Sequence, residues 1–272
     1  MPQKAHFISG LTRSGSTLLA SILRQNPWFH ASRTSPVGGL VERIWEAMNE
    51  DNEFSTFISP EQKRALILRI FWAYYHPQVD KEIVFDTNRL WCSNLPLIRE
   101  LFPEAKVICC VRNIAWIMDS IELLIQRNSF DVSRLFNNPA ERARVYSRTE
   151  ALSQGSRLVG YAYNALKKAV YSEHSASFLL VDYELLTIKP AKTMSLIYQF
   201  LGEDSFEHDL ENVQYEEAEF DKKLKTQGLN QVRAQVEFKP RKTILHPDLF
   251  ERFNGLSFWE ESSYSKPSVI VT

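Results

Sequence analysis

The 272-residue sequence has few cysteines and glycines and no surplus of either charge sign. Its three cysteines cannot pair off completely and no Cys-x-x-Cys motif occurs, which excludes a disulfide framework. A formal net charge of −1 gives no overall attraction for nucleic acid or for an anionic membrane surface. No apolar run reaches the length of a bilayer span, and the first ten residues lack the pattern of a secretory leader. We therefore expect a cytoplasmic protein that binds neither nucleic acid nor membrane.

Metal and redox chemistry are not indicated either. The six histidines show no metal-ligand spacing, so we expect no metal. Cys109 and Cys110 are adjacent within an apolar run, and neighbouring side chains on a strand point to opposite faces. This pattern favours buried free thiols over reactive ones.

Apolar residues make up 44% of the chain and charged residues 24%, which is typical of a globular protein. Short apolar runs alternate with segments of helical spacing. Strands are expected at about 5–9, 29–32, 83–86, 106–111 and 177–182, and helices at about 17–24, 59–76, 94–101, 114–125, 138–171 and 190–201. The alternation predicts an α/β fold of three layers, with a mostly parallel central sheet and helices on both faces.

We expect one domain over residues 1–272. Helical insertions are expected at about 37–78 and 128–172, and a loop-rich C-terminal segment at about 203–272. Ligands of such sheets bind at the carboxyl ends of the strands, so the loops that follow the strands are the places to search for chemistry.

The loop from Gly10 to Thr17 lies between the first strand and the first helix. Its glycine spacing is that of a P-loop, but Ser16 stands where nucleotide triphosphatases carry a lysine. Backbone N–H groups, the helix N-terminus and the charge of Arg13 still favour an anion. The expected anion-binding residues are Arg13, Ser14, Gly15, Ser16 and Thr17.

The loop sequence Arg-Ser-Gly-Ser-Thr-Leu-Leu, residues 13–19, resembles the 5′-phosphosulfate loop of sulfotransferases that use 3′-phosphoadenosine 5′-phosphosulfate (PAPS). The resemblance covers about 5–33 and 83–125, and is closer to the tyrosylprotein and general bacterial pattern than to the steroid and phenol enzymes. It implies a P-loop-related fold, PAPS as donor, PAP as product, and a hydroxyl or amine acceptor on a small molecule or secondary metabolite.

A second signature of the family is a buried strand ending in Val-Arg, followed by a helix with a serine eight residues later. Val111, Arg112 and Ser120 match it. Arg112 would emerge at the end of the strand and Ser120 two turns into the helix, so both can converge on one dianion. The resemblance assigns them to the 3′-phosphate of PAPS.

Three further donor contacts are implied by the resemblance. A tyrosine after the strand at 177–182 lies near the cofactor in the family, which here is Tyr183. Related enzymes also close a basic C-terminal segment over the donor. Its counterpart is Phe238–Lys242, with Lys239 and Arg241 as the contacts, and a solvated charge run is the alternative interpretation.

The catalytic residues are less clearly marked. Related enzymes often carry a lysine just after the strand at 83–86, whereas this chain has Asp86-Thr-Asn-Arg89. We therefore predict that Arg13 and Arg89 stabilise the transferring group. The register of the family's glutamate base falls on Arg33 and Thr34, which leaves Asp86 as the first candidate base. Glu42 and His30 follow it, and Asp86 as a turn cap is an equal alternative.

Two other functions stay open at this point. A small-molecule kinase is disfavoured by Ser16 and by the lack of a Walker-B aspartate. A binding protein that holds PAP without catalysis fits the missing lysine and glutamate. The sequence does not identify the acceptor or the oligomeric state, for which a homodimer is one alternative.

Overall fold

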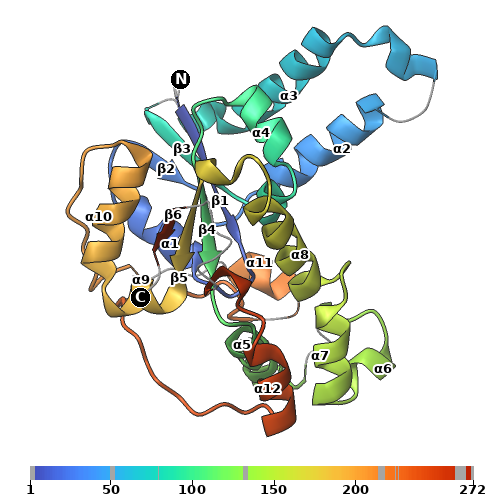
Figure 1. The fold of residues 1–272 in the computed structure, drawn as a ribbon, viewed down its shortest axis with the longest axis vertical. Helices are drawn as coiled ribbons and strands as arrows, with labels where there is room; N and C mark the ends of the chain where they lie inside the picture. Colours follow the sequence, from blue (N-terminus) through green and yellow to red (C-terminus); the bar gives the residue numbers. More distant parts are fainter. Residues whose placement is uncertain are drawn as a thin grey trace.

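The computed structural model describes residues 4–49, 53–78, 80–130, 134–213, 218–223, 225, 227–260 and 268–270. Within these residues, six parallel strands form one sheet in the order β2-β3-β1-β4-β5-β6. The strands are β1 (Lys4–Gly10), β2 (Phe29–Ala31), β3 (Ile83–Thr87), β4 (Val107–Val111), β5 (Phe178–Asp182) and β6 (Ser268–Ile270). Helices cover both faces of the sheet (Figure 1), which confirms the predicted three-layer α/β fold.

The helices divide between the two faces. One face carries α1 (Ser16–Leu23), α9 (Tyr183–Ile188) and α10 (Pro190–Leu201). The other carries α2 (Val37–Asn49), α3 (Pro60–Tyr75), α4 (Leu95–Leu101), α5 (Ile114–Arg127), α7 (Val145–Ser153), α8 (Leu158–Val170) and α12 (Pro247–Asn254). The remaining elements are α6 (Pro139–Arg142), α11 (Ala218–Lys223) and the 3₁₀ turns η1 (Glu53–Phe57), η2 (His76–Gln78), η3 (Arg89–Cys92), η4 (Ser175–Ser177) and η5 (Phe258–Glu260).

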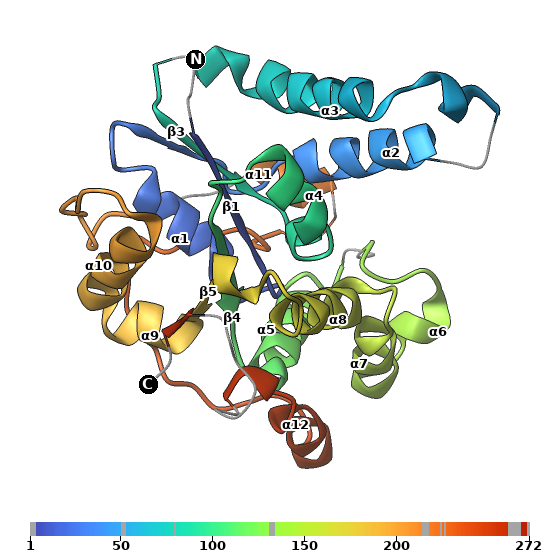
Figure 2. The same cartoon turned by 45° about the horizontal axis from the view of Figure 1, so that its top comes forward.

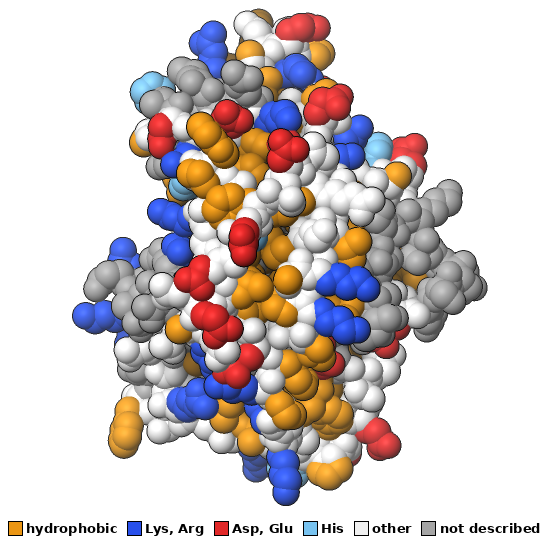
Figure 3. All heavy atoms as spheres, turned by 90° about the vertical axis from the view of Figure 1, so that its left-hand side faces the viewer, with side chains coloured by type: hydrophobic (Ala, Val, Ile, Leu, Met, Phe, Trp, Pro, Cys, Tyr) orange, Lys and Arg blue, Asp and Glu red, His pale blue; other side chains and the backbone are white. Residues whose placement is uncertain are grey.

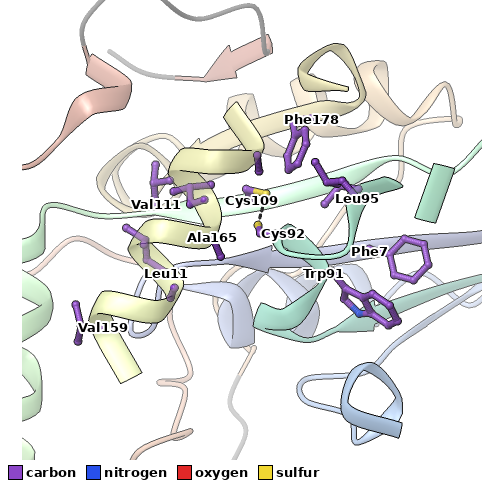
Figure 4. Packing of buried hydrophobic residues seen from close by; sticks show 14 of the residues in the cluster. Phe7, Leu11, Trp91, Cys92, Leu95, Cys109, Val111, Val159, Ala165 and Phe178 are labelled. Carbon is purple, nitrogen blue, oxygen red and sulfur yellow. Dashed lines mark hydrogen bonds between the residues drawn. The ribbon is translucent and has the colours of Figure 1, made fainter. Parts of the chain in front are cut away.

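Each face of the sheet has its own hydrophobic core. Strand β4 is buried on both sides, so its successive residues alternate between the two cores. Cys109 belongs to the core under α5 and α8 and Cys110 to the core under α1. The sulfur atoms of Cys109 and Cys92 lie 3.4 Å apart in the first of these cores (Figure 4). All three cysteines are buried and free, as the sequence predicts.

The insertion between β2 and β3 forms a pair of helices. In both ribbon views α2 and α3 lie side by side and extend away from the sheet (Figures 1 and 2). Helix α3 starts at the expected capping box, in which Ser59 and Gln62 exchange hydrogen bonds of 2.8 and 3.3 Å. No bounds could be predicted for α2, because the Gly38-Gly39 pair in its first turn lowers its helix propensity.

Two other parts of the fold differ from the expectation. The helical stretch predicted at 138–171, with a break near Gly155, is divided into α6, α7 and α8; the break between α7 and α8 lies where it was expected, and the break after α6 was not predicted. Residues before α8 fold back over it, and a Cβ on Gly160 would lie 2.2 Å from the carbonyl oxygens of Ser153 and Gln154. Strand β6 was not predicted, because it lies in the C-terminal segment at 203–272 that we expected to be rich in loops.

Glycine 10 fixes where the first loop begins. It is paired with Cys110 across β1 and β4, and its φ of 110° lies outside the range that other residues adopt readily. A Cβ at this position would lie 2.2 Å from the carbonyl oxygen of Cys110. The close approach of the two strands therefore requires a glycine here.

We expect Gly10→Ala to lower the free energy of unfolding by roughly 2–5 kcal/mol, because the methyl group adds both backbone strain and overlap with β4. Urea denaturation monitored by circular dichroism measures the change. Gly255→Ala is the matched control, since nothing lies within 4 Å of its Cβ position and its φ is not positive. A Gly10→Ala protein as stable as Gly255→Ala would contradict the steric argument.

Candidate functional site

A cavity of about 870 Å³ lies at the carboxyl ends of the central strands. Its wall includes the loop after β1, Arg89 after β3, Arg112 after β4 and Tyr183 after β5. The chain leaves β1 toward β2 and β3 on one side, while β4 and β5 lie on the other. Such a switch point is where open parallel sheets bind ligands. The cavity is thus at the edge that the sequence indicates.

The loop presents backbone donors to this cavity. Arg13 and Gly15 have φ values of 56° and 98°, both in the left-handed region. A left-handed arginine costs roughly 1–3 kcal/mol, and such strain is concentrated at binding sites. Helix α1 begins directly after Gly15, and among the described residues no side chain caps it. Its first N–H groups are therefore available to an anion.

Ser14 does not contribute its hydroxyl to the cavity. The side chain is fully buried, and its Oγ lies 2.5 Å from the carbonyl oxygen of Leu11 and 2.8 Å from that of Cys110. The predicted contact between this hydroxyl and an anion is contradicted, because the hydroxyl anchors the loop to β4. Ser16 and Thr17 do line the cavity.

Arg13 connects the loop to two distant segments. Its Nε donates to the hydroxyl of Ser120 at 3.1 Å, and a terminal nitrogen donates to the carbonyl oxygen of Leu229. Burial and the neighbouring Arg112 lower the pKa of Arg13 to about 10. The guanidinium is thus still charged at neutral pH, beside another positive group.

Arg112 has a buried donor with no partner. Its guanidinium stacks on the ring of Tyr183 at 4.2 Å from the centroid, and a terminal nitrogen donates to the carbonyl oxygen of Arg13 at 3.3 Å. Its Nε is buried and, within the described residues, makes no hydrogen bond. Burial lowers the pKa of Arg112. An unpaired buried donor is costly, so this nitrogen indicates a ligand that accepts a hydrogen bond.

Tyr183 supports both parts of this arrangement. A Cβ on Gly15 would lie 2.9 Å from the ring carbon Cδ2 of Tyr183, so the ring packs directly under the loop. Because the same ring carries the Arg112 guanidinium, it holds that group close to the loop.

Residues 227–241, which we call the covering segment, form the outer wall of the cavity. A fully buried carboxylate in α5 holds the end of this segment. Asp119 accepts hydrogen bonds of 2.7 Å from the hydroxyl of Thr243 and from the N–H of Ile244, and forms an ion pair with Arg241. Lys239 also lines the cavity and pairs with Glu237.

The charge of the wall is strongly positive. Seven arginines and Lys239 line it, and Glu237 is the one carboxylate among the described residues of the wall. The lining arginines are Arg13, Arg33, Arg89, Arg112, Arg127, Arg233 and Arg241. On the outer face drawn in Figure 3, by contrast, acidic, basic and hydrophobic side chains are interspersed. The arrangement suits a ligand with several negative charges.

Asp86 and Arg89 have different surroundings although both were predicted to be catalytic. Arg89 lines the cavity. Asp86 is fully buried away from it, and its carboxylate accepts hydrogen bonds from Ser35 and Tyr75, both 2.5 Å, and from the Trp91 indole at 2.6 Å. Burial raises the pKa of Asp86, and the three donors oppose that shift. A carboxylate in these surroundings cannot reach a substrate in the cavity. Asp86 therefore has a structural role and is not the catalytic base.

The other two candidate bases do not reach the site. Neither Glu42, in α2, nor His30, in β2, belongs to the described wall of the cavity. Glu42 has a raised pKa because of partial burial and the nearby charge of Glu46, and His30 packs on Tyr75. Both residues follow the loop closely in the sequence. In the structure, α2 and β2 place their side chains against other parts of the protein.

Sequence reasoning missed Asp119 and Arg127. Asp119 is an acid within an otherwise apolar stretch of α5, which could have marked it as a buried partner of a cation. Arg127 is seven residues after Ser120, so both lie on the same face of the helix. That spacing was a usable signal for a second cavity residue.

The described part of the chain has neither a candidate metal site nor a candidate membrane span. No group of three or more histidine, cysteine, aspartate or glutamate side chains there could hold a metal ion. None of its helices has both the length and the apolar character required to cross a bilayer.

Of three comparisons with known proteins, one, with family models, identifies a family. The family model described as "Sulfotransferase family" matches residues 6–208. A search of curated proteins gave no significant match. A sulfotransferase from Alicyclobacillus acidocaldarius is 13% identical, with a TM-score of 0.52 over 93% of this chain and 90% of the other. A sulfotransferase domain from the curacin biosynthetic pathway is 16% identical, with a TM-score of 0.51 over 94% and 92% of the two chains. These two structures support the fold.

We expect Asp86→Ala to lower the free energy of unfolding by about 3 kcal/mol or more, because it removes the acceptor of three buried donors, of which Tyr75 alone has a second acceptor, Ser32 at 3.3 Å. Asp86→Asn is the matched control, since an amide can accept from Trp91 and donate to the hydroxyl oxygens of Ser35 and Tyr75. Urea denaturation of both variants tests the structural role. Equal stability of Asp86→Ala and the wild type would contradict it.

Proposed function

The chain belongs to the sulfotransferase family, and on that premise we propose that it transfers the sulfuryl group of PAPS to a hydroxyl group of a small molecule. Sulfuryl transfer is the reaction of the family, and the chain is an enzyme of this class. The donor, the class of acceptor and the role of each residue are our proposal.

The unpaired Nε of Arg112 beside an uncapped helix N-terminus is the observation that carries the proposal. It supports two anion-binding places in one cavity, one at the loop and one between β4 and α5. PAPS has anionic groups at both ends of its ribose, a 5′-phosphosulfate and a 3′-phosphate. The two places therefore fit one donor better than they fit two separate anions.

We assign the two anionic groups to different residues. The backbone N–H groups of Gly15, Ser16 and Thr17, with the two hydroxyls, hold the 5′-phosphosulfate. Arg112 and Ser120 hold the 3′-phosphate, to which a planar guanidinium can donate two parallel hydrogen bonds. Tyr183 keeps the Arg112 guanidinium in place, and Lys239 and Arg241 add positive charge from the outer side.

In the transfer step, the acceptor oxygen bonds to sulfur and the bond from sulfur to the 5′-phosphate oxygen breaks. The leaving phosphate keeps the electron pair, and the proton of the acceptor hydroxyl passes to an oxygen of this departing 5′-phosphate. Arg13 stabilises the charge that develops on the bridging oxygen, because its guanidinium is fixed by Ser120 and Leu229 before the reaction. Arg89 stabilises the sulfuryl oxygens from the β3 side.

Ser16 and the free cysteines bear on the class of reaction and on the location of the protein. Ser16 in place of the P-loop lysine favours sulfuryl transfer over a small-molecule kinase. The cytoplasm is the proposed location, because three free buried thiols suit a reducing compartment. A protein that only binds PAP would share the donor site, so turnover of PAPS with a simple phenol distinguishes the two.

We expect PAP to bind with micromolar affinity and to lose roughly 100-fold in affinity in Arg112→Ala, because a bidentate charged contact is worth about 3 kcal/mol. Arg13→Ala should weaken binding by a similar factor. Isothermal titration calorimetry measures both. Arg252→Ala, at an exposed surface ion pair, is the control that should leave PAP affinity unchanged. Binding of ATP in preference to PAP would refute the donor assignment.

Asp119 should act as a positioning residue for the covering segment. We expect Asp119→Asn to weaken PAP binding by roughly tenfold, because the amide cannot hold the Arg241 cation and the N–H of Ile244 together. Limited proteolysis should also cut residues 227–241 faster in this variant. Glu150→Gln, which removes an exposed carboxylate, is the matched control. Unchanged proteolysis and PAP affinity in Asp119→Asn would exclude the role.

A further inference from the structure

Part of the cavity wall consists of Arg89 and of residues to which no group of the donor is assigned. Six side chains from η3, α5, the segment before α6 and α8 line it, and we call them the acceptor lobe: Arg89, Leu123, Leu124, Arg127, Leu135 and Leu158. Contacts between these elements show that they are neighbours. The hydroxyls of Ser93 and Tyr161 lie 2.8 Å apart, and Arg157 donates to the carbonyl oxygen of Leu135 at 2.9 Å.

Helix α5 continues the wall from the reaction centre into this lobe. Ser120, Leu124 and Arg127 are spaced at i, i+4 and i+7 and so share one face of the helix. Ser120 receives the hydrogen bond from Arg13, which marks the loop end of the face. At 1.5 Å per residue, Arg127 lies about 10 Å further along the helix. An acceptor that reacts at the loop can therefore reach Arg127 with its far end.

The surface between these two points is apolar. Leu124 is buried, and Leu123, Leu135 and Leu158 are partly exposed on the cavity wall. Apolar groups are removed from water when they pack on such a wall, which favours an acceptor with a hydrocarbon body.

No carboxylate among the described residues is paired with the two arginines of the lobe. Within the described residues, the side chains of Arg89 and Arg127 make no ion pair or hydrogen bond, and Glu237 on the covering segment pairs with Lys239. The dipole of α5 favours a cation in the last turn of the helix, which explains a basic residue such as Arg127 there. The dipole does not explain why this residue lines the cavity.

We propose that the acceptor is an amphipathic anion: a hydroxyl compound whose hydrocarbon body packs on the leucines of the lobe and whose carboxylate or phosphate group binds Arg127. This inference rests on the proposed function, because it takes the Arg112 side of the cavity to hold the donor. Arg89 stays at the reacting end, and Arg127 selects for the charge at the far end.

The test compares matched acids and amides as acceptors with saturating PAPS. The probes are 3-(4-hydroxyphenyl)propanoate, its homologues with longer chains, and the corresponding amides. We expect the wild type to prefer the best acid over its amide by roughly tenfold or more in kcat/KM. Arg127→Gln should abolish this preference through a higher KM for the acid, and Arg127→Lys should restore part of it. Arg69→Gln, on exposed α3 away from the cavity, should behave as wild type.

The acceptor assays test the role of Arg127, and PAP binding tests the donor site. Equal kcat/KM for acid and amide, or an acid preference that survives in Arg127→Gln, overturns the inference. If no phenol is turned over, calorimetry of acid and amide binding to the PAP-loaded protein decides, and the absence of an acid preference there overturns it as well. PAP affinity is measured alongside. Failure of the wild type to bind PAP refutes the donor site, whereas intact PAP binding without acid preference refutes the acceptor inference alone.

Discussion

Repulsion between arginines held close together is the constraint on which the site depends. The guanidinium of Arg112 donates to the backbone of Arg13, and the proximity of the two charges contributes to lowering the pKa of Arg13 to about 10. Such a cluster is stable only if rigid elements hold it. The buried sheet does so from below, with Ser14 bonded to β4 and the Tyr183 ring wedged between the loop and Arg112. Binding of an anion lowers the electrostatic repulsion between the two arginines.

The features that could be predicted from the sequence are those formed by residues close together in the chain. The loop and the Arg112–Ser120 pair could be recognised because each lies where one strand gives way to one helix. The side-chain directions that sequence reasoning missed depend on distant partners. Asp86 stands at the carboxyl end of a strand, yet Tyr75 of α3 and Trp91 of η3 turn its carboxylate into the core. Ser14 was misassigned for the same reason, since its acceptor on β4 is nearly one hundred residues away.

Helix α5 contacts three different parts of the protein with three of its sides. Ser120 faces the loop arginine, Asp119 next to it holds the covering segment, and Glu122 forms a buried ion pair with Arg148 of α7. The position of the reacting groups is thereby coupled to the helical insertion that shapes the acceptor side. Binding residues are often carried by loops and insertions on a rigid scaffold, and the ion pair between Glu122 and Arg148 joins the insertion of this chain to that scaffold.

The hydrogen bond from Arg13 to the carbonyl oxygen of Leu229 has a consequence for the order of events in turnover. It closes the cavity wall directly over the reacting end of the loop, so a nucleotide seated beneath it leaves only after the bond has opened. We therefore expect an ordered cycle in which the nucleotide enters first and departs last. Opening of the covering segment is then a separate conformational step in each turnover.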